Sequence, residues 1–263
     1  MNTRALPALF AAGAVAAQIV YPLVSGGTRD VVTFAVVALL AAACAAHAAV
    51  SSGVAAAVKL VVLTAGIGLL AEIIGSSTGY PFGCYSYAQG RIGPSIADVP
   101  IIVPFAWTAG MYPVWCVSKY VSARVGRNAR VTRLALTVAG VVGWDFYLDP
   151  QMVSAGLWTW CSPHASMPGL DGIPYTNYLG WTLVALIMAV GMELIDRPQQ
   201  QTDVGLPAVP TGLFLWTWLG SSLAHAVFLP ELGWSALYGL VAMGVVGVPL
   251  LVSLGRRHRT PVH

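Results

Sequence analysis

Charge is scarce in this sequence. Only 9% of the 263 residues are Asp, Glu, Lys or Arg, whereas 57% are hydrophobic, and the mean hydropathy is +0.74. This composition excludes a water-soluble domain, because too few polar side chains exist to cover its surface. Apolar runs of about 20 residues, long enough to cross a bilayer, recur along the chain.

Motifs for metals and cofactors are also missing. No HxxxH or HxxHH cluster supplies the many histidine ligands of a di-iron site. No GxGxxG follows a predicted strand, as a dinucleotide site would require. The four cysteines form no CxxC pair or other metal-binding spacing. We therefore expect neither a metal ion nor a cofactor.

The apolar runs predict an all-α fold, a polytopic transmembrane helix bundle. It would form a single integral membrane domain over 1–263, with a polar linker at about 198–209. The first run is long for the apolar part of a secretory signal, so we expect it to be retained. The eight expected spans are roughly 5–25, 31–50, 55–76, 100–121, 131–149, 177–195, 210–229 and 233–254.

The basic residues give these spans an orientation. With the amino terminus inside, all of the 13 Lys and Arg residues except Arg29 and Arg91 fall on the inner side. The positive-inside rule then places both termini in the cytoplasm of a multi-pass cell-membrane protein. The cluster from Arg124 to Arg133 is expected beside anionic lipids, so we expect membrane lipids and no nucleic acid as partners. The oligomeric state stays open.

Two long loops, 77–99 and 150–176, are rich in Gly, Pro and aromatic residues. Gly and Pro at this density predict defined turns, and the aromatic rings suit a membrane interface. Both loops are expected on the outer side. Cys84 and Cys161 could form a disulfide if the loops touch.

The few acids within the apolar runs are the most informative residues. Asp145 and Asp149 lie four residues apart, on one helix face, and we expect Pro150 to end that helix. Ionisable groups inside a bilayer are costly and usually functional. Two close buried carboxylates cannot easily both be charged, so at least one is expected to be a neutral proton donor. The structural alternative is pairing with Arg or helix capping, but Arg29 and Arg91 are the only outer-side cations.

Other polar residues are expected in the same leaflet. Glu72 lies near the outer end of the third span and could be a third acid. Asn177 opens the sixth span, where it could position water or the acid together with Tyr85. His225, near the outer end of the seventh span, is either a proton relay or a packing contact. We expect these groups to surround one cavity.

A neutral acid in an aromatic cavity is suited to protonating an isolated alkene. Protonation of an isoprene end gives a tertiary carbocation, which aromatic ring faces stabilise. Water or an internal double bond then captures the cation. The same aromatic residues could instead form an interfacial belt. The candidates are Tyr80, Phe82, Tyr85, Tyr87, Trp107, Trp144, Phe146, Tyr147, Trp158 and Trp160.

Three sequence blocks occur in order between about residues 65 and 195. They are Glu72 with 79–87 (GYPFGCYSY) and 104–107 (PFAW), then 144–152 (WDFYLDPQM) with 156–160 (GLWTW), then 174–181 (PYTNYLGW). Together they resemble the carotenoid-biosynthesis integral membrane family, which includes carotenoid 1,2-hydratases and bisanhydrobacterioruberin hydratases. The resemblance implies cofactor-independent addition of water across the terminal double bond of a linear carotenoid.

The leading hypothesis is therefore a hydro-lyase acting on a linear carotenoid or polyprenoid, with Asp145, Asp149 and Glu72 as catalytic acids. A membrane terpenoid cyclase, which uses the same protonation without water, is the alternative. A proton-coupled transporter or lipid-binding protein is a second alternative. The expected substrate-binding residues are Tyr85, Phe82, Trp107, Trp144, Trp158, Asn177 and His225.

Overall fold

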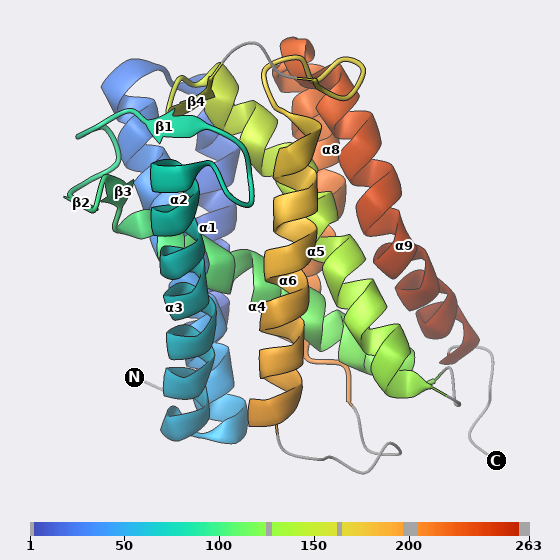
Figure 1. Cartoon of the computed structure of the whole chain (residues 1–263). Coiled ribbons are helices and arrows are strands. Elements are labelled where there is room, and N and C mark those ends of the chain that lie inside the picture. The colour runs from blue at the N-terminus through green and yellow to red at the C-terminus, as the bar shows by residue number, and fades with distance from the viewer. Residues whose placement is uncertain (1–2, 125–127, 162–164, 197–204, 258–263) are drawn as a thin grey trace, which may run out of the picture.

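The chain folds into a bundle of long helices with two small sheets at one end (Figure 1). The structure is a computed structural model that describes residues 3–124, 128–161, 165–196 and 205–257. The linker residues 198–204, Arg127, His164, Arg197 and Arg259 lie outside this part. The elements are η1 (Thr3–Ala5), α1 (Leu6–Val20), η2 (Tyr21–Leu23), α2 (Gly26–Ser52), α3 (Val54–Thr78), β1 (Tyr85–Tyr87), β2 (Ser95–Ile96), β3 (Val99–Pro100), α4 (Ile102–Ser122), α5 (Ala129–Ser154), β4 (Trp158–Trp160), α6 (Tyr175–Ile195), α7 (Ala208–Leu215), η4 (Trp216–Gly220), α8 (Ser221–Leu223), η5 (Ala224–Phe228), η6 (Pro230–Leu232) and α9 (Gly233–Arg257).

The predicted all-α membrane fold is confirmed. Within the described residues, six helices are long and apolar enough to cross a bilayer: α1 with its flanking turns, α2, α3, α5, α6 and α9. Large apolar side chains are exposed on their outer faces, including Val62 (67% exposed) and Leu194 (75% exposed). Such surfaces suit lipid, and backbone groups satisfied within helices are what a bilayer requires. The count of eight spans and the orientation stay predictions.

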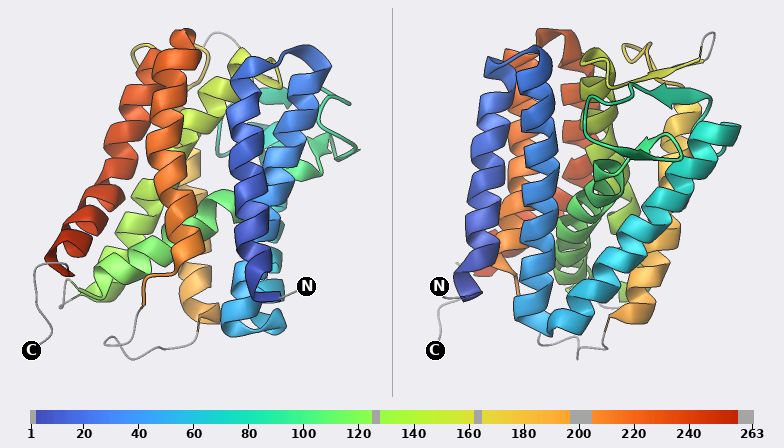
Figure 2. Two further views of the ribbon diagram at one scale, coloured as in Figure 1. Left: turned by 180° about the vertical axis from the view of Figure 1, so that it is seen from behind. Right: turned by 90° about the vertical axis from the view of Figure 1, so that its left-hand side faces the viewer.

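Helix α4 is the core of the bundle. It packs against α2, α3, α5, α7 and α9 (Figure 2), and its residues are buried on every face. A Cβ at Gly110 would lie 2.1 Å from the Trp144 ring, so this glycine allows α5 to pack closely on α4. A helix surrounded in this way needs an apolar surface all round, without a lipid-facing side.

The expectation that Pro150 ends the fifth helix is wrong, because α5 continues to Ser154. Proline has no N–H to donate, which frees the carbonyl four residues earlier, on Phe146. Ser235 of α9 donates its hydroxyl to that carbonyl over 2.5 Å. The imidazole Nδ1 of His225 lies 2.8 Å from the same Ser235 oxygen. The neighbouring helices therefore replace the missing hydrogen bond.

The two long loops meet through the antiparallel strands β1 and β4. Tyr85 lies opposite Trp160, and Tyr87 lies opposite Trp158. Side chains alternate along a strand, so these four aromatic side chains share one face, while the central residue of each strand is exposed. The strands form a roof over the upper end of the bundle (Figure 1).

A disulfide fixes the roof at one end. Cys84 comes directly before β1, Cys161 directly after β4, and the two are bonded. The Cys161 N–H also donates to the Cys84 carbonyl over 2.8 Å. The two loops therefore touch, which was the condition for this pairing.

The other end of the bundle carries the first and last described helix ends and a set of ion pairs. The start of α1 and the end of α9 both lie there (Figure 2). Lys119 pairs with Asp196 at 2.6 Å, and Arg133 pairs with Glu193. Acids at this end are thus compensated by cations, in contrast to those described next.

Candidate active site

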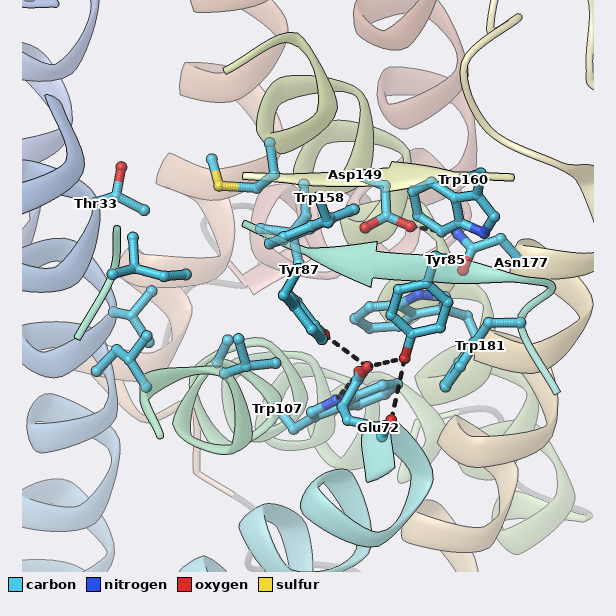
Figure 3. A pocket seen from close by; sticks show the side chains of 18 residues that line it. Thr33, Glu72, Tyr85, Tyr87, Trp107, Asp149, Trp158, Trp160, Asn177 and Trp181 are labelled. Atoms are coloured by element: carbon cyan, nitrogen blue, oxygen red, sulfur yellow. Dashed lines mark hydrogen bonds between the residues drawn. The ribbon is translucent and has the colours of Figure 1, made fainter. Parts of the chain in front are cut away.

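A cavity of about 50 Å³ lies beneath the β1–β4 roof (Figure 3). Helices α2, α3, α4, α5 and α6 form its walls together with the two strands. We call it the acid cavity. Its polar lining residues are Thr33, Glu72, Asp149 and Asn177, and its aromatic lining residues are Phe82, Tyr85, Tyr87, Trp107, Trp158, Trp160 and Trp181.

Glu72 is held by three hydrogen-bond donors (Figure 3). The hydroxyls of Tyr85 and Tyr87 donate to its Oε2 over 2.5 and 2.7 Å, and the Trp107 indole donates to its Oε1 over 3.1 Å. Burial raises the pKa of Tyr85 and of Tyr87, and the nearby Glu72 carboxylate raises both further. Both phenols therefore stay protonated and act as hydrogen-bond donors. These contacts favour a Glu72 side chain that accepts hydrogen bonds over one that donates a proton.

Two glycines on α3 let the aromatic side chains approach the acid. A Cβ at Gly68, one turn before the acid, would lie 2.5 Å from the Trp107 ring. A Cβ at Gly75 would lie 2.7 Å from the Phe82 ring and 2.8 Å from the Tyr85 hydroxyl. The helix surface is therefore shaped to receive these rings, and a methyl group would displace them.

Asp145 and Asp149 share one amide group. The Asn177 side-chain nitrogen donates to Asp145 Oδ2 over 3.1 Å and also to Asp149 Oδ2. All three residues are buried, at 3% exposure or less. Asp149 lines the acid cavity, whereas Asp145 lies one helical turn behind it. Within the described residues, Asp145 Oδ1 has no hydrogen-bond partner.

No cation compensates these acids in the part of the chain that the structure describes. Arg91, the nearest candidate in the sequence, pairs instead with Asp30 at 2.6 Å and donates to two carbonyls after α5. Arg29, in the first turn of α2, donates its Nε–H to the Val24 carbonyl just before that helix. Two adjacent carboxylates without a cation repel each other when both are charged, and this favours a proton held between Asp145 and Asp149.

The cavity collects most of the predicted site residues, but not all of them. Asp145 lines neither cavity, although it touches Asn177. Trp144 and His225 line a second, neighbouring cavity. The predicted residues that line the acid cavity are Glu72, Phe82, Tyr85, Trp107, Asp149, Trp158 and Asn177.

Three aromatic lining residues were not among the predicted substrate-binding residues. Tyr87 and Trp160 were only aromatic candidates, and Trp181 was not singled out. The Tyr-x-Tyr and Trp-x-Trp spacings of β1 and β4 carried the signal for two of them, because residues i and i+2 of a strand share a face. Trp181 lies one helical turn after Asn177 on α6. Its ring stacks on Trp107 with a centroid distance of 3.9 Å.

Comparisons with known proteins identify the family of this chain. A family model described as carotenoid biosynthesis protein matches residues 32–247, which include every residue of the acid cavity. The bisanhydrobacterioruberin hydratase of Haloarcula japonica is 29% identical over 175 residues, which are 64% of this chain and 56% of the relative. The chain thus spans only slightly more than half of that protein. No solved structure matches the chain. This multi-pass membrane protein belongs to the carotenoid biosynthesis protein family.

Proposed function

We propose that this protein is a cofactor-independent hydratase that adds water across the terminal double bond of a linear carotenoid or related polyprenoid. The observation that carries the proposal is the uncompensated pair Asp145 and Asp149, one of which opens on an aromatic cavity. The similarity to a protein named as a hydratase supports this reaction class.

Asp149 is the proton donor in this proposal, because it is the member of the pair that lines the cavity. Its proton moves to the CH carbon of the terminal double bond, which leaves the positive charge on the tertiary carbon. The Asn177 amide N–H groups then stabilise the new carboxylate beside that of Asp145. A positioned acid of this kind typically contributes a rate factor of about 10²–10⁴.

The walls of the cavity stabilise the cation. Trp107, Trp158 and Trp181 line the space, and the contact of a cation with an aromatic ring face is worth about 2 kcal/mol or more when it is shielded from water. Glu72 adds negative charge on the same wall, held in place by its three donors. An acceptor-only Glu72 thus acts through its field, while Asp149 transfers the proton.

Water captures the cation, and its surplus proton returns to Asp149. One group in the cavity favours an oxygen nucleophile. The Trp160 indole N–H is buried without a hydrogen-bond partner in the described residues, and Trp160 lines the acid cavity. An unpaired buried donor costs about 1–3 kcal/mol, which an oxygen atom of water or of the alcohol would relieve. A cyclase, whose reacting atoms are all carbon, has no use for this donor.

Mass analysis of pigments separates the proposed hydratase from its rivals. The chain is expressed in a host that accumulates a linear carotenoid, beside the same host without it. We expect a new pigment heavier than the substrate by one water, with an absorption spectrum unchanged because the conjugated system is intact. A cyclase would give a pigment of unchanged mass and altered retention, and a transporter or lipid-binding protein would leave the pigment chemically unchanged.

A further inference from the structure

A second cavity of about 120 Å³ lies beside the acid cavity. Parts of α1, α2, α4 and α5 enclose it, together with the segment 216–225, where two π-helical stretches widen the helix. Such π-helical turns recur at functional sites because they re-aim side chains. We call it the polar cavity. Its polar lining residues are Gln18, Tyr21, Thr33, Tyr147, Gln151, Ser221 and His225.

The polar side chains of this cavity keep hydrogen-bonding capacity for water. Gln18 Oε1 accepts from the Trp216 indole over 2.8 Å, which leaves the amide nitrogen of Gln18 available. Gln151 Oε1 lies 2.9 Å from His225 Nε2. An ordered water needs two to four polar partners and about 10–15 Å³ of space. The polar cavity exceeds both requirements.

The two cavities meet at a set of shared residues. Thr33, Val37, Ala106, Leu148 and Met152 line both of them, and we call these the boundary residues. Four of the five are apolar. An apolar boundary keeps bulk water away from the acid pair and the hydrocarbon, yet single waters can cross it once per reaction cycle.

We propose that the polar cavity is a water site that supplies the nucleophile to the acid cavity across the boundary residues. This inference rests on the proposed hydratase function. It gives Gln151 and His225 a role in holding water, beyond the structural support that His225 gives to Ser235.

The chemistry provides a direct measure of water supply. Once Asp149 has protonated the alkene, the cation has two fates. If water bonds to the cationic carbon and returns one proton to Asp149, the alcohol forms. If the cation loses a proton to Asp149 instead, the alkene is restored. In deuterium oxide the second fate leaves deuterium in recovered substrate whenever the CHD carbon rotates and loses its original hydrogen. The ratio of alcohol formed to deuterium in the substrate therefore reports how often water arrives.

Two boundary variants should move this ratio in opposite directions. Ala106→Leu fills the boundary, and we expect the ratio to fall at least about tenfold, with deuterium incorporation retained or increased. Met152→Ala widens the boundary, and we expect the ratio to rise. Purified full-length protein in lipid, a linear carotenoid and mass spectrometry of both pools suffice. Because the ratio is internal to each variant, differences in the amount of folded protein cancel.

Each outcome decides the proposal. An unchanged ratio of alcohol to substrate deuterium in Met152→Ala overturns it. This result decides the matter even if Ala106→Leu does not fold and loses both reactions. A raised KM with an unchanged ratio in Ala106→Leu would overturn it too, because the boundary would then hold the polyene itself. If the unaltered protein gives neither alcohol nor deuterium exchange, the hydratase function fails instead, which is a distinguishable result.

Discussion

At the residue scale, the arrangement around Asn177 explains why two acids can lie so close together. Its amide has two N–H groups, and each of them meets one carboxylate. Asn177 therefore holds the two carboxylates in place without a cation. A cation in its position would stabilise both acids in the charged form. Only Asp149 opens on the cavity. The two carboxylates consequently have different environments and different roles.

Replacing Asp149 by Asn tests that division. We expect hydration to fall by about 10²–10⁴-fold, because the amide cannot deliver a proton, while the Asn177 contact and the fold are retained. Initial rates with purified protein measure the loss. The matched control is Asp30→Asn, an acid of the same end of the bundle that binds Arg91 outside the acid cavity. Equal losses in both variants would mean that the effect is structural.

At the same scale, Gly68 is expected to be irreplaceable. A methyl group there would press on the Trp107 ring at 2.5 Å and push its indole away from Glu72. We expect Gly68→Ala to cost about 1–3 kcal/mol of stability and to lower activity more than tenfold. The matched control is Gly66→Ala on the same helix, where a Cβ meets no atom within 4 Å. Similar activities of the two variants would contradict the assigned fit.

At the scale of elements, the disulfide and the β1–β4 pair act as one roof. Strands of three residues are too short to pair by themselves, so their geometry depends on the bond between Cys84 and Cys161. We expect Cys84→Ser with Cys161→Ser to lower stability by about 2–4 kcal/mol and to reduce activity, since Tyr85 and Tyr87 hold Glu72 from β1. Thermal unfolding with and without reductant checks this. Reductant should lower the unfolding temperature of the unaltered protein and leave that of the double variant unchanged. An effect of equal size on both would contradict a stabilising role of the disulfide in the roof.

The elements also show what could be predicted from the sequence and what could not. Long apolar runs predict the helices, because a span must satisfy its backbone internally. The roof strands were not predicted, since only tertiary partners stabilise them. Pro150 was expected to end α5, but Ser235, distant in sequence, replaces the lost hydrogen bond. Local patterns therefore placed the acids on their helix, while contacts between distant segments decided which aromatic residues reach them.

At the scale of the whole molecule, the two ends of the bundle differ chemically. One end has the roof, its disulfide and the uncompensated acids. The other has most of the basic residues and the ion pairs Lys119–Asp196 and Arg133–Glu193. Disulfides persist in oxidising compartments, and basic residues accumulate on the cytoplasmic side. Both rules favour the same predicted orientation, with the roof on the outer side and the start of α1 and the end of α9 on the cytoplasmic side.

Site-directed labelling tests this orientation. A membrane-impermeant maleimide should react with Ile96→Cys in intact cells, because this exposed residue lies in the outer loop. Ser52→Cys, exposed at the end of α2 that lies away from the roof, should react only after lysis. The free cysteines Cys44 and Cys116 are not exposed and should give little background. The reverse pattern of labelling would invert the topology.

The central claim is that the acid pair protonates an alkene and that water, not carbon, captures the cation. The most direct measurement is the mass of the product that the purified protein forms from a linear carotenoid in water labelled with oxygen-18. We predict that the product is heavier than the substrate by one labelled water and that Asp149→Asn lowers the rate of its formation by about 10²–10⁴-fold. A product of unchanged mass, or one whose oxygen is unlabelled, would contradict this account.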